Sequence, residues 1–141
     1  MAIKNFITEP HRRTRTDHAT ETAEDYVEAI AEIVKLNGRC RVVDLAKRFA
    51  VSHVTVTKII ARLENEGLVQ TERYRPIKLT AVGNSLAASS RQRHEIVYQF
   101  LVAIGVDPKT ASLDAEGIEH HVSPKTLAKM KSFIDGNSDP Q

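Results

Sequence analysis

The chain has 141 residues, 41% of them hydrophobic, which suits one compact domain or two small ones and argues against a disordered polymer. Only 5% are aromatic and none is Trp, so single-strand nucleic-acid binding by base stacking is disfavoured. The net charge is only +2, but its distribution is uneven: residues 38–80 contain nine Lys/Arg and four Asp/Glu. A local excess of positive charge is expected in a segment that binds nucleic acid.

The N-terminal segment, residues 1–20, has few apolar side chains and carries His11, Arg12, Arg13 and Arg15, so a flexible basic arm is predicted. It lacks the apolar core of a secretory signal. No run in the chain approaches the roughly 18 apolar residues of a membrane span. Cys40 stands alone, which excludes an internal disulfide and leaves a structural role for its thiol. We therefore expect a cytoplasmic protein with no membrane partner.

The next segment, residues 21–80, has the pattern of a winged helix-turn-helix. A helix is predicted at about 22–36, a short one at 43–49 and a third at 53–66, which Ser52 caps and Gly67 ends. Two short β-prone runs follow around a basic loop and predict a hairpin, the wing. The third helix is expected to bury one apolar face. That face comprises Val54, Ile59, Ile60 and Leu63.

The polar side of the third helix and the wing predict a surface for double-stranded DNA, because a major groove admits one helix whose first residues reach base edges. Short hydroxyl and imidazole side chains begin the helix, cations flank it, and two arginines lie in the wing. The candidate DNA-binding residues are Ser52, His53, Thr55, Thr57, Lys58, Arg62, Arg73 and Arg75. The alternative is a solvated basic face with no partner.

The last segment, residues 81–141, predicts an all-helical domain. One helix is expected at about 81–104, another from Asp107-Pro108 through Val122, and a last one from Ser123-Pro124 to near Ile134. The fold class is therefore mainly α with a small β-wing.

A mixed carboxylate and imidazole cluster lies in the second of these helices. Glu116, Glu119 and His120 are at i, i+3 and i+4, so they share one side of a helix and form an oxygen and nitrogen donor set for a divalent metal. Asp25 with Glu28, and His94, are further candidate ligands elsewhere in the chain. A solvated acidic face, charges that complement a helix dipole and a surface histidine are the alternatives.

Five segments together resemble the DtxR/MntR family of metalloregulators, in particular its manganese-sensing branch. They are EDYVEAI, VSHVTVTKIIARLENEGLV, YRPIKLTAVG, RHEIVYQFLVAIGV and DAEGIEHHVS, and the resemblance covers about 22–134. It implies a metal site built from the first helix, the long helix and the EGIEHH segment. The implied ligands are Asp25, Glu28, His94, Glu116, Glu119 and His120.

The resemblance also implies a function: a homodimeric, non-enzymatic repressor of manganese uptake genes that binds a pseudo-palindromic operator when Mn²⁺, two ions per subunit, is bound. The iron-sensing branch has Met and Cys where Asp25 and Glu116 stand, and a donor set without sulfur favours Mn²⁺. Fe²⁺ as the signal is one alternative, since such sites accept both ions. A winged helix that senses a non-metal ligand is a second, and a metal-dependent hydrolase is a third.

Overall fold

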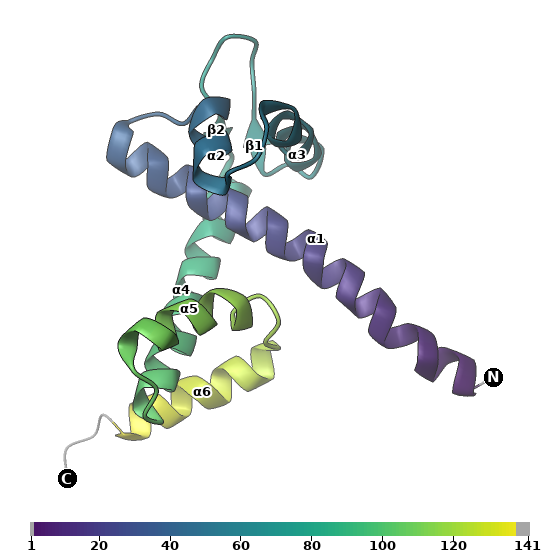
Figure 1. The fold of residues 1–141 in the computed structure, drawn as a ribbon, viewed down its shortest axis with the longest axis vertical. Helices are drawn as coiled ribbons and strands as arrows, with labels where there is room; N and C mark the ends of the chain where they lie inside the picture. The colour runs from purple at the N-terminus through teal and green to yellow at the C-terminus, as the bar shows by residue number, and fades with distance from the viewer. Residues whose placement is uncertain (1, 138–141) are drawn as a thin grey trace. The chain divides into compact units, whose positions relative to one another are not determined.

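The computed structural model describes the backbone of residues 2–137 and the side chains of residues 18–136. This part of the chain forms helices and one two-stranded antiparallel sheet (Figure 1). The elements are α1 (Ala2–Asn37), α2 (Val42–Phe49), α3 (His53–Asn65), β1 (Val69–Gln70), β2 (Lys78–Leu79), α4 (Ala81–Ala103), α5 (Pro108–Ile118) and α6 (Pro124–Asn137). The predicted mainly helical fold with a small β-wing is confirmed. None of the helices among the described residues is long and apolar enough to cross a membrane.

Contacts divide the chain into two compact units. Residues 19–88 form the first, which we call the winged-helix unit. Residues 89–137, together with 2–18, form the second, which we call the helical unit. The long helices α1 and α4 each contribute to both.

Helix α1 differs from its prediction, since it begins at Ala2 and not near Thr22. Residues 2–20, predicted as a flexible arm, are therefore helical, whereas Met1 and the side chains of the basic cluster lie outside the described residues. Residues 23–33 of the helix are anchored in the core of the winged-helix unit. Because elongating an existing helix costs far less than nucleating one, helix can continue into a segment with few apolar residues.

The core of the winged-helix unit lies where α1, α2 and α3 meet. Its largest fully buried side chains include Val27 and Ile30 of α1, Leu45 of α2 and Leu63 of α3. The ring of Tyr26 stacks on that of Phe49, with 4.4 Å between ring centroids. At roughly 25 cal/mol per Å² of apolar surface, this burial is the main term that holds the unit together.

The buried face of α3 agrees with the predicted one except in the first turn of the helix. Val56, Ile60 and Leu63 are buried, a spacing of four and three that matches the helical repeat. Val54 was expected inside, but its side chain is 64% exposed. Ile59 is half-buried against the core. The prediction was therefore correct for Ile60 and Leu63 and wrong for Val54, whose place in the core is taken by Val56.

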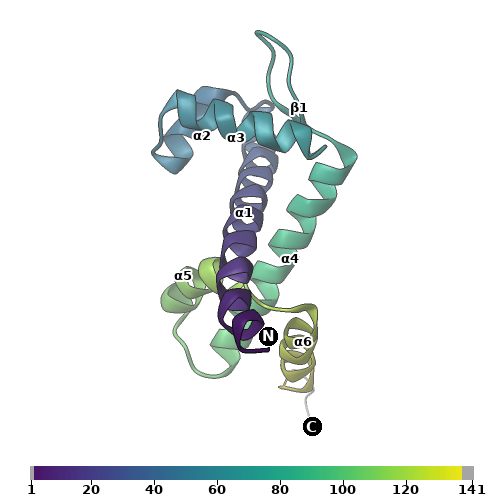
Figure 2. The ribbon, with the colours of Figure 1, turned by 90° about the vertical axis from the view of Figure 1, so that its right-hand side faces the viewer.

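The hairpin pairs Val69 with Leu79 and Gln70 with Lys78. An isolated bridge adds Cys40 to this sheet opposite Ile77, whose N–H donates to the Cys40 carbonyl at 2.8 Å. Cys40 is fully buried, in agreement with a structural role. The loop between the two strands, residues 71–77, extends beyond α3 (Figures 1 and 2).

The helical unit is built from α4, α5 and α6. Asp107 caps α5, because its carboxylate accepts a hydrogen bond from the Thr110 N–H. This hydrogen bond lowers the pKa of the Asp107 carboxyl. Helix α5 ends at Ile118 and not at Val122, the predicted end. Ser123 accepts from the Thr126 N–H and so caps α6, which continues three residues past the expected end to Asn137.

Candidate metal centre and nucleic-acid interface

The beginning of α3 presents an exposed polar surface. Ser52 is its N-cap and accepts a hydrogen bond from the Thr55 N–H at 3.1 Å. The side chains of Ser52, His53, Thr55 and Thr57 are all exposed. An exposed, capped helix N-terminus carries free N–H groups and a positive partial charge, which suits contact with a phosphate or a base edge.

The hydroxyls on this surface are already partly engaged. The Thr57 hydroxyl donates to the His53 carbonyl at 2.8 Å, and the Ser52 and Thr55 hydroxyl oxygens lie 3.0 Å apart. Thr57 therefore has lone pairs left for a donor on DNA, but its proton is committed. His53 offers an imidazole that donates on one nitrogen and accepts on the other.

Val54 also belongs to this exposed surface, although the sequence pattern predicts it in the core. It follows His53 in the first turn of α3, and an exposed valine there offers methyl groups that can pack on the C5-methyl of thymine. The missed signal was the four-and-three spacing of Val56, Ile60 and Leu63, which leaves Val54 off the buried stripe.

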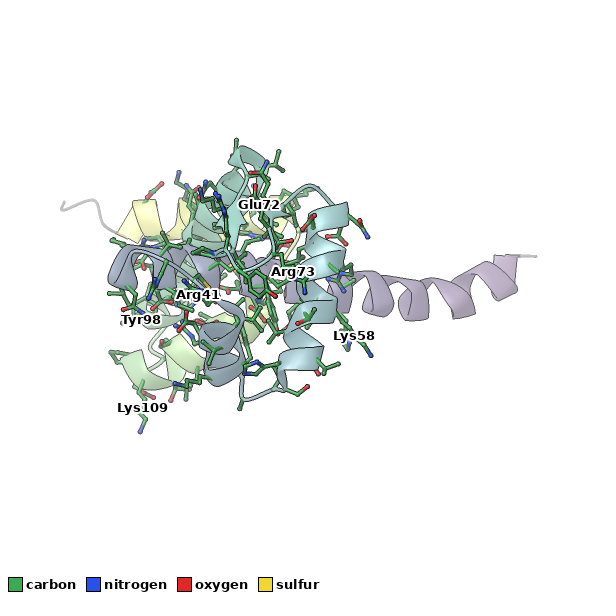
Figure 3. All side chains as sticks on the ribbon, turned by 90° about the horizontal axis from the view of Figure 1, so that it is seen from above. Arg41, Lys58, Glu72, Arg73, Tyr98 and Lys109 are labelled. Carbon is green, nitrogen blue, oxygen red and sulfur yellow. The ribbon has the colours of Figure 1, made fainter. Side chains whose placement is uncertain are left out.

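The predicted cations divide into two groups. Lys58 is exposed and projects outward from α3 (Figure 3). Arg62 is half-buried, donates to the Ala19 carbonyl at 2.9 Å and lies 3.4 Å from the Glu66 carboxylate. Lys58 is thus available to a phosphate, whereas the Arg62 guanidinium is held within the unit.

The wing carries Arg73, labelled in Figure 3, and Arg75, and both are exposed on the loop between β1 and β2. The Arg75 guanidinium lies 3.1 Å from Glu72, an exposed pair of little energetic weight. The Arg73 guanidinium lies 5.1 Å from the ring centroid of Tyr74. Both cations remain accessible to a polyanion.

Four of the six predicted metal ligands are in the helical unit. His94 lies on α4, Glu116 on α5, and Glu119 and His120 in the turn directly after α5. Although α5 ends at Ile118, Glu119 keeps helical backbone angles, so it still projects to the same side as Glu116. The predicted relation between these two carboxylates holds despite the shorter helix.

The structure brings a histidine from α4 against both carboxylates. The Nδ1 atom of His94 lies 2.8 Å from a Glu119 oxygen and 3.5 Å from a Glu116 oxygen. Ligand atoms of these three residues lie within 4.8 Å of one another, as ligands of one ion would. Neighbouring ligands of an octahedral ion with bonds of about 2.1 Å are about 3 Å apart, so the spacing fits.

Glu119 is the centre of this cluster. Its side chain is 1% exposed, one oxygen faces His94, and the other lies 3.2 Å from Nε2 of the buried His120. A buried carboxylate needs polar or charged partners, and here each of its oxygens lies beside an imidazole nitrogen. A buried carboxylate with imidazole nitrogens beside it has the oxygen and nitrogen donors that a divalent cation would take.

The two remaining predicted ligands, Asp25 and Glu28, belong to the other compact unit. Asp25 and Glu28 lie on α1 in the winged-helix unit, both half-buried. Their membership of the metal site stays a prediction. His121, which follows the buried His120, is exposed.

Comparison with known proteins matches each half of the chain to one family. Residues 18–77 match the model described as iron dependent repressor, N-terminal DNA binding domain, and residues 80–140 match iron dependent repressor, metal binding and dimerisation domain. The chain belongs to the iron-dependent repressor family. The resemblance inferred from the sequence is thereby confirmed, and the family is one of transcriptional regulators, not enzymes.

Individual relatives agree with the family match. The transcriptional regulator MntR of Escherichia coli O157:H7 is 45% identical over 125 residues, covering 89% of this chain and 81% of that protein. The HTH-type transcriptional regulator MntR of Bacillus subtilis is 36% identical over 115 residues, covering 82% and 81%. A solved manganese-dependent transcriptional repressor in complex with manganese has a TM-score of 0.71 at 28% identity. The match covers 80% of this chain and 52% of that repressor, so this chain spans about half of the repressor's length.

Proposed function

We propose that this chain is a manganese(II)-responsive repressor that binds the operators of manganese uptake genes when the metal is plentiful. The observation that carries this proposal is the position of Glu119, buried between two imidazoles and near Glu116, in a chain whose other unit is a winged helix. Relatives whose names include manganese support the choice of metal.

The donor set also favours Mn²⁺. His94, Glu116, Glu119 and His120 would hold the metal with imidazole nitrogen and carboxylate oxygen, and none of them supplies sulfur. We propose that Asp25 and Glu28 complete the set for two ions per subunit. Bound metal supplies positive charge that neutralises carboxylates which otherwise repel one another. The family name favours a second candidate signal, Fe²⁺.

Coupling between metal and DNA follows from linkage. If metal raises the affinity for the operator by some factor, DNA raises the affinity for metal by the same factor. We propose that both ligands favour the same conformational state of a cytoplasmic homodimer, which presents two copies of α3 to a pseudo-palindromic operator. Membrane partners and organic substrates have no place in this proposal.

An exposed apolar groove in the helical unit supports the dimer. It has a volume of about 560 Å³ and is lined by Leu113, Asp114, Gly117, Ile118, His121 and Val122. Leu113 is 68% exposed, which is costly for a leucine unless a partner covers it. A second copy of this chain is the proposed partner, because the matching family domain is one of dimerisation.

The test is a DNA-binding titration by fluorescence anisotropy at fixed salt, with the metal-free protein and then with Mn²⁺, anaerobic Fe²⁺ or Zn²⁺. The DNA is the duplex upstream of this gene and of metal-transporter genes in its genome. We expect tight binding with Mn²⁺, loss of it in Glu119→Gln, and no change in Glu95→Gln, a matched control at an exposed position beside His94. Calorimetry with Mn²⁺ alone measures the site directly.

Equal binding with and without metal would refute the metal switch. Activation by anaerobic Fe²⁺ but not by Mn²⁺ would replace manganese with iron as the signal. Absence of stoichiometric heat with any of the three ions would favour a winged helix that senses a different ligand.

A further inference from the structure

Arg62 joins two helices of the winged-helix unit. Its Nη2 atom donates to the carbonyl oxygen of Ala19 on α1 at 2.9 Å, although the two residues are 43 positions apart in the sequence. Its buried Nε atom lies 3.4 Å from a carboxylate oxygen of Glu66, the C-cap of α3. A carbonyl oxygen has two lone pairs, so Ala19 can accept from a side chain even inside a helix. The guanidinium is therefore engaged on two sides by the protein itself.

Ala19 lies at a boundary along α1. It is the first residue of the winged-helix unit, whereas residues 2–18 of the same helix belong to the helical unit. Ala19 is exposed, and the part of α1 that is buried in the core begins at Ala23. The hydrogen bond from Arg62 thus holds α1 to α3 at a point outside the hydrophobic core, where the helix leaves the winged-helix unit.

This second point of attachment restricts the direction of α1. Two separate contacts fix one helix relative to another, whereas a single apolar patch leaves some freedom of rotation about it. Asp25 and Glu28, the proposed metal ligands on α1, follow Ala19 on the same helix. Energetic coupling between two sites is carried by packed side chains and hydrogen bonds between rigid elements. Arg62 is therefore placed to relate the orientation of α1 to that of α3.

We propose that Arg62 is a positioning residue, which clamps α3 to α1 and so couples metal binding to operator binding. The sequence pattern predicts a contact of Arg62 with DNA instead. The inference rests on the proposed function and names a residue that carries its coupling. Arginine suits this task because the planar guanidinium presents its donors in fixed directions, one towards Ala19 and one towards Glu66, whereas lysine has a single charged atom.

The experiment measures the affinity of the full-length protein for an operator duplex with and without Mn²⁺, at several salt concentrations. The duplex is selected from a randomised library with the unaltered protein. The ratio of the two affinities is the coupling factor. In Arg62→Gln we expect this factor to fall roughly tenfold, because the clamp is lost. The slope of log affinity against log salt should stay that of the unaltered protein, since no phosphate contact is removed.

Two matched variants on α3 separate the possible causes. Lys58→Gln removes an exposed cation one turn earlier. It should make the salt slope shallower by about one unit and weaken binding equally with and without metal, so the coupling factor stays the same. Glu66→Gln removes the exposed ion pair and keeps the hydrogen bond to Ala19, so neither the slope nor the coupling factor should change.

Two further measurements do not depend on operator affinity. In the metal-free protein, the amides of residues 19–23 should exchange hydrogen faster in Arg62→Gln, while those of residues 27–33, which the core holds, should not. Calorimetry with Mn²⁺ in the presence and absence of the duplex measures how far DNA tightens metal binding. By linkage, Arg62→Gln should lose this tightening by the same factor as the coupling measured with DNA.

Four outcomes would overturn the inference. An unchanged coupling factor in Arg62→Gln would show that no clamp transmits the metal signal. A shallower salt slope with that factor unchanged would make Arg62 a phosphate contact. An equal loss of coupling in Glu66→Gln would assign the effect to the ion pair. Affinity lost equally with and without Mn²⁺, together with a lower melting temperature, would make Arg62 a structural residue only. Absence of metal dependence in the unaltered protein would instead refute the proposed function itself, so the two failures are distinguishable.

Discussion

The contact between α4 and the hairpin gives the sharpest stability prediction. Gly83, in the first turn of α4, packs so closely on the residue before β1 that a Cβ atom there would lie 2.0 Å from the Leu68 carbonyl oxygen and 3.2 Å from the Leu79 side chain. An ordinary carbon–oxygen contact is about 3.3 Å, so Gly83→Ala requires the helix and the strand to separate by more than an ångström.

That separation would break local hydrogen bonds. The Thr80 N–H donates to the Leu68 carbonyl at 3.0 Å, and the Thr80 hydroxyl donates to the Gly67 carbonyl at 2.7 Å. Their loss costs about 1 kcal/mol each. Strained packing adds about 1–3 kcal/mol. The better helix propensity of alanine offsets about 1 kcal/mol.

The expected loss is therefore about 2–4 kcal/mol in the free energy of unfolding, from these same terms. The winged-helix unit, residues 19–88, is the size of a small domain, for which 3 kcal/mol lowers the melting temperature by about 15 °C. Circular dichroism during heating and during urea titration measures both quantities.

The matched control is Gly136→Ala. It makes the same substitution in α6 at a position where a Cβ atom meets nothing within 4 Å, so it should be neutral or slightly stabilising. A melting temperature of Gly83→Ala at or above that of the unaltered protein would refute the close approach of α4 to the strand.

The remaining predictions concern the thiol, the recognition surface and the dimer. Burial, with a smaller contribution from Asp44, raises the pKa of Cys40 to about 11 from its ordinary value of 9.0, so the folded state holds the thiol proton more tightly. The associated stability is complete below about pH 9 and is lost as the pH rises towards 11; urea midpoints should fall less over that window in Cys40→Ala. Val54→Ala should weaken binding to the operator but not to the same duplex with uracil in place of thymine, and equal weakening on both would exclude the methyl contact. Leu113→Glu should yield monomers in sedimentation velocity, and a persisting dimer would place the interface on another face.

Local signals in the sequence were sufficient for most element boundaries. Ser52, Asp107 and Ser123 each stand one residue before a helix in the structure, because a short polar side chain there satisfies N–H groups that the helix leaves open. The hairpin was predictable from two β-prone runs around a polar loop. Glu116 and Glu119 were assigned to one side from spacing alone, and the structure agrees although the helix ends early.

Other features depended on contacts between segments that are distant in sequence. Spacing within α5 contains no information about α4, so the 2.8 Å approach of His94 to Glu119 exists only once the helices pack. The bridge between Cys40 and Ile77 likewise joins residues on either side of α2 and α3. The exposure of Val54 was decided by which face of α3 the core accepts, and the start of α1 at Ala2 by elongation from a packed helix. The sequence determined the elements and the chemistry available on each, while tertiary packing decided which donor atoms meet, because only packing sets distances between segments.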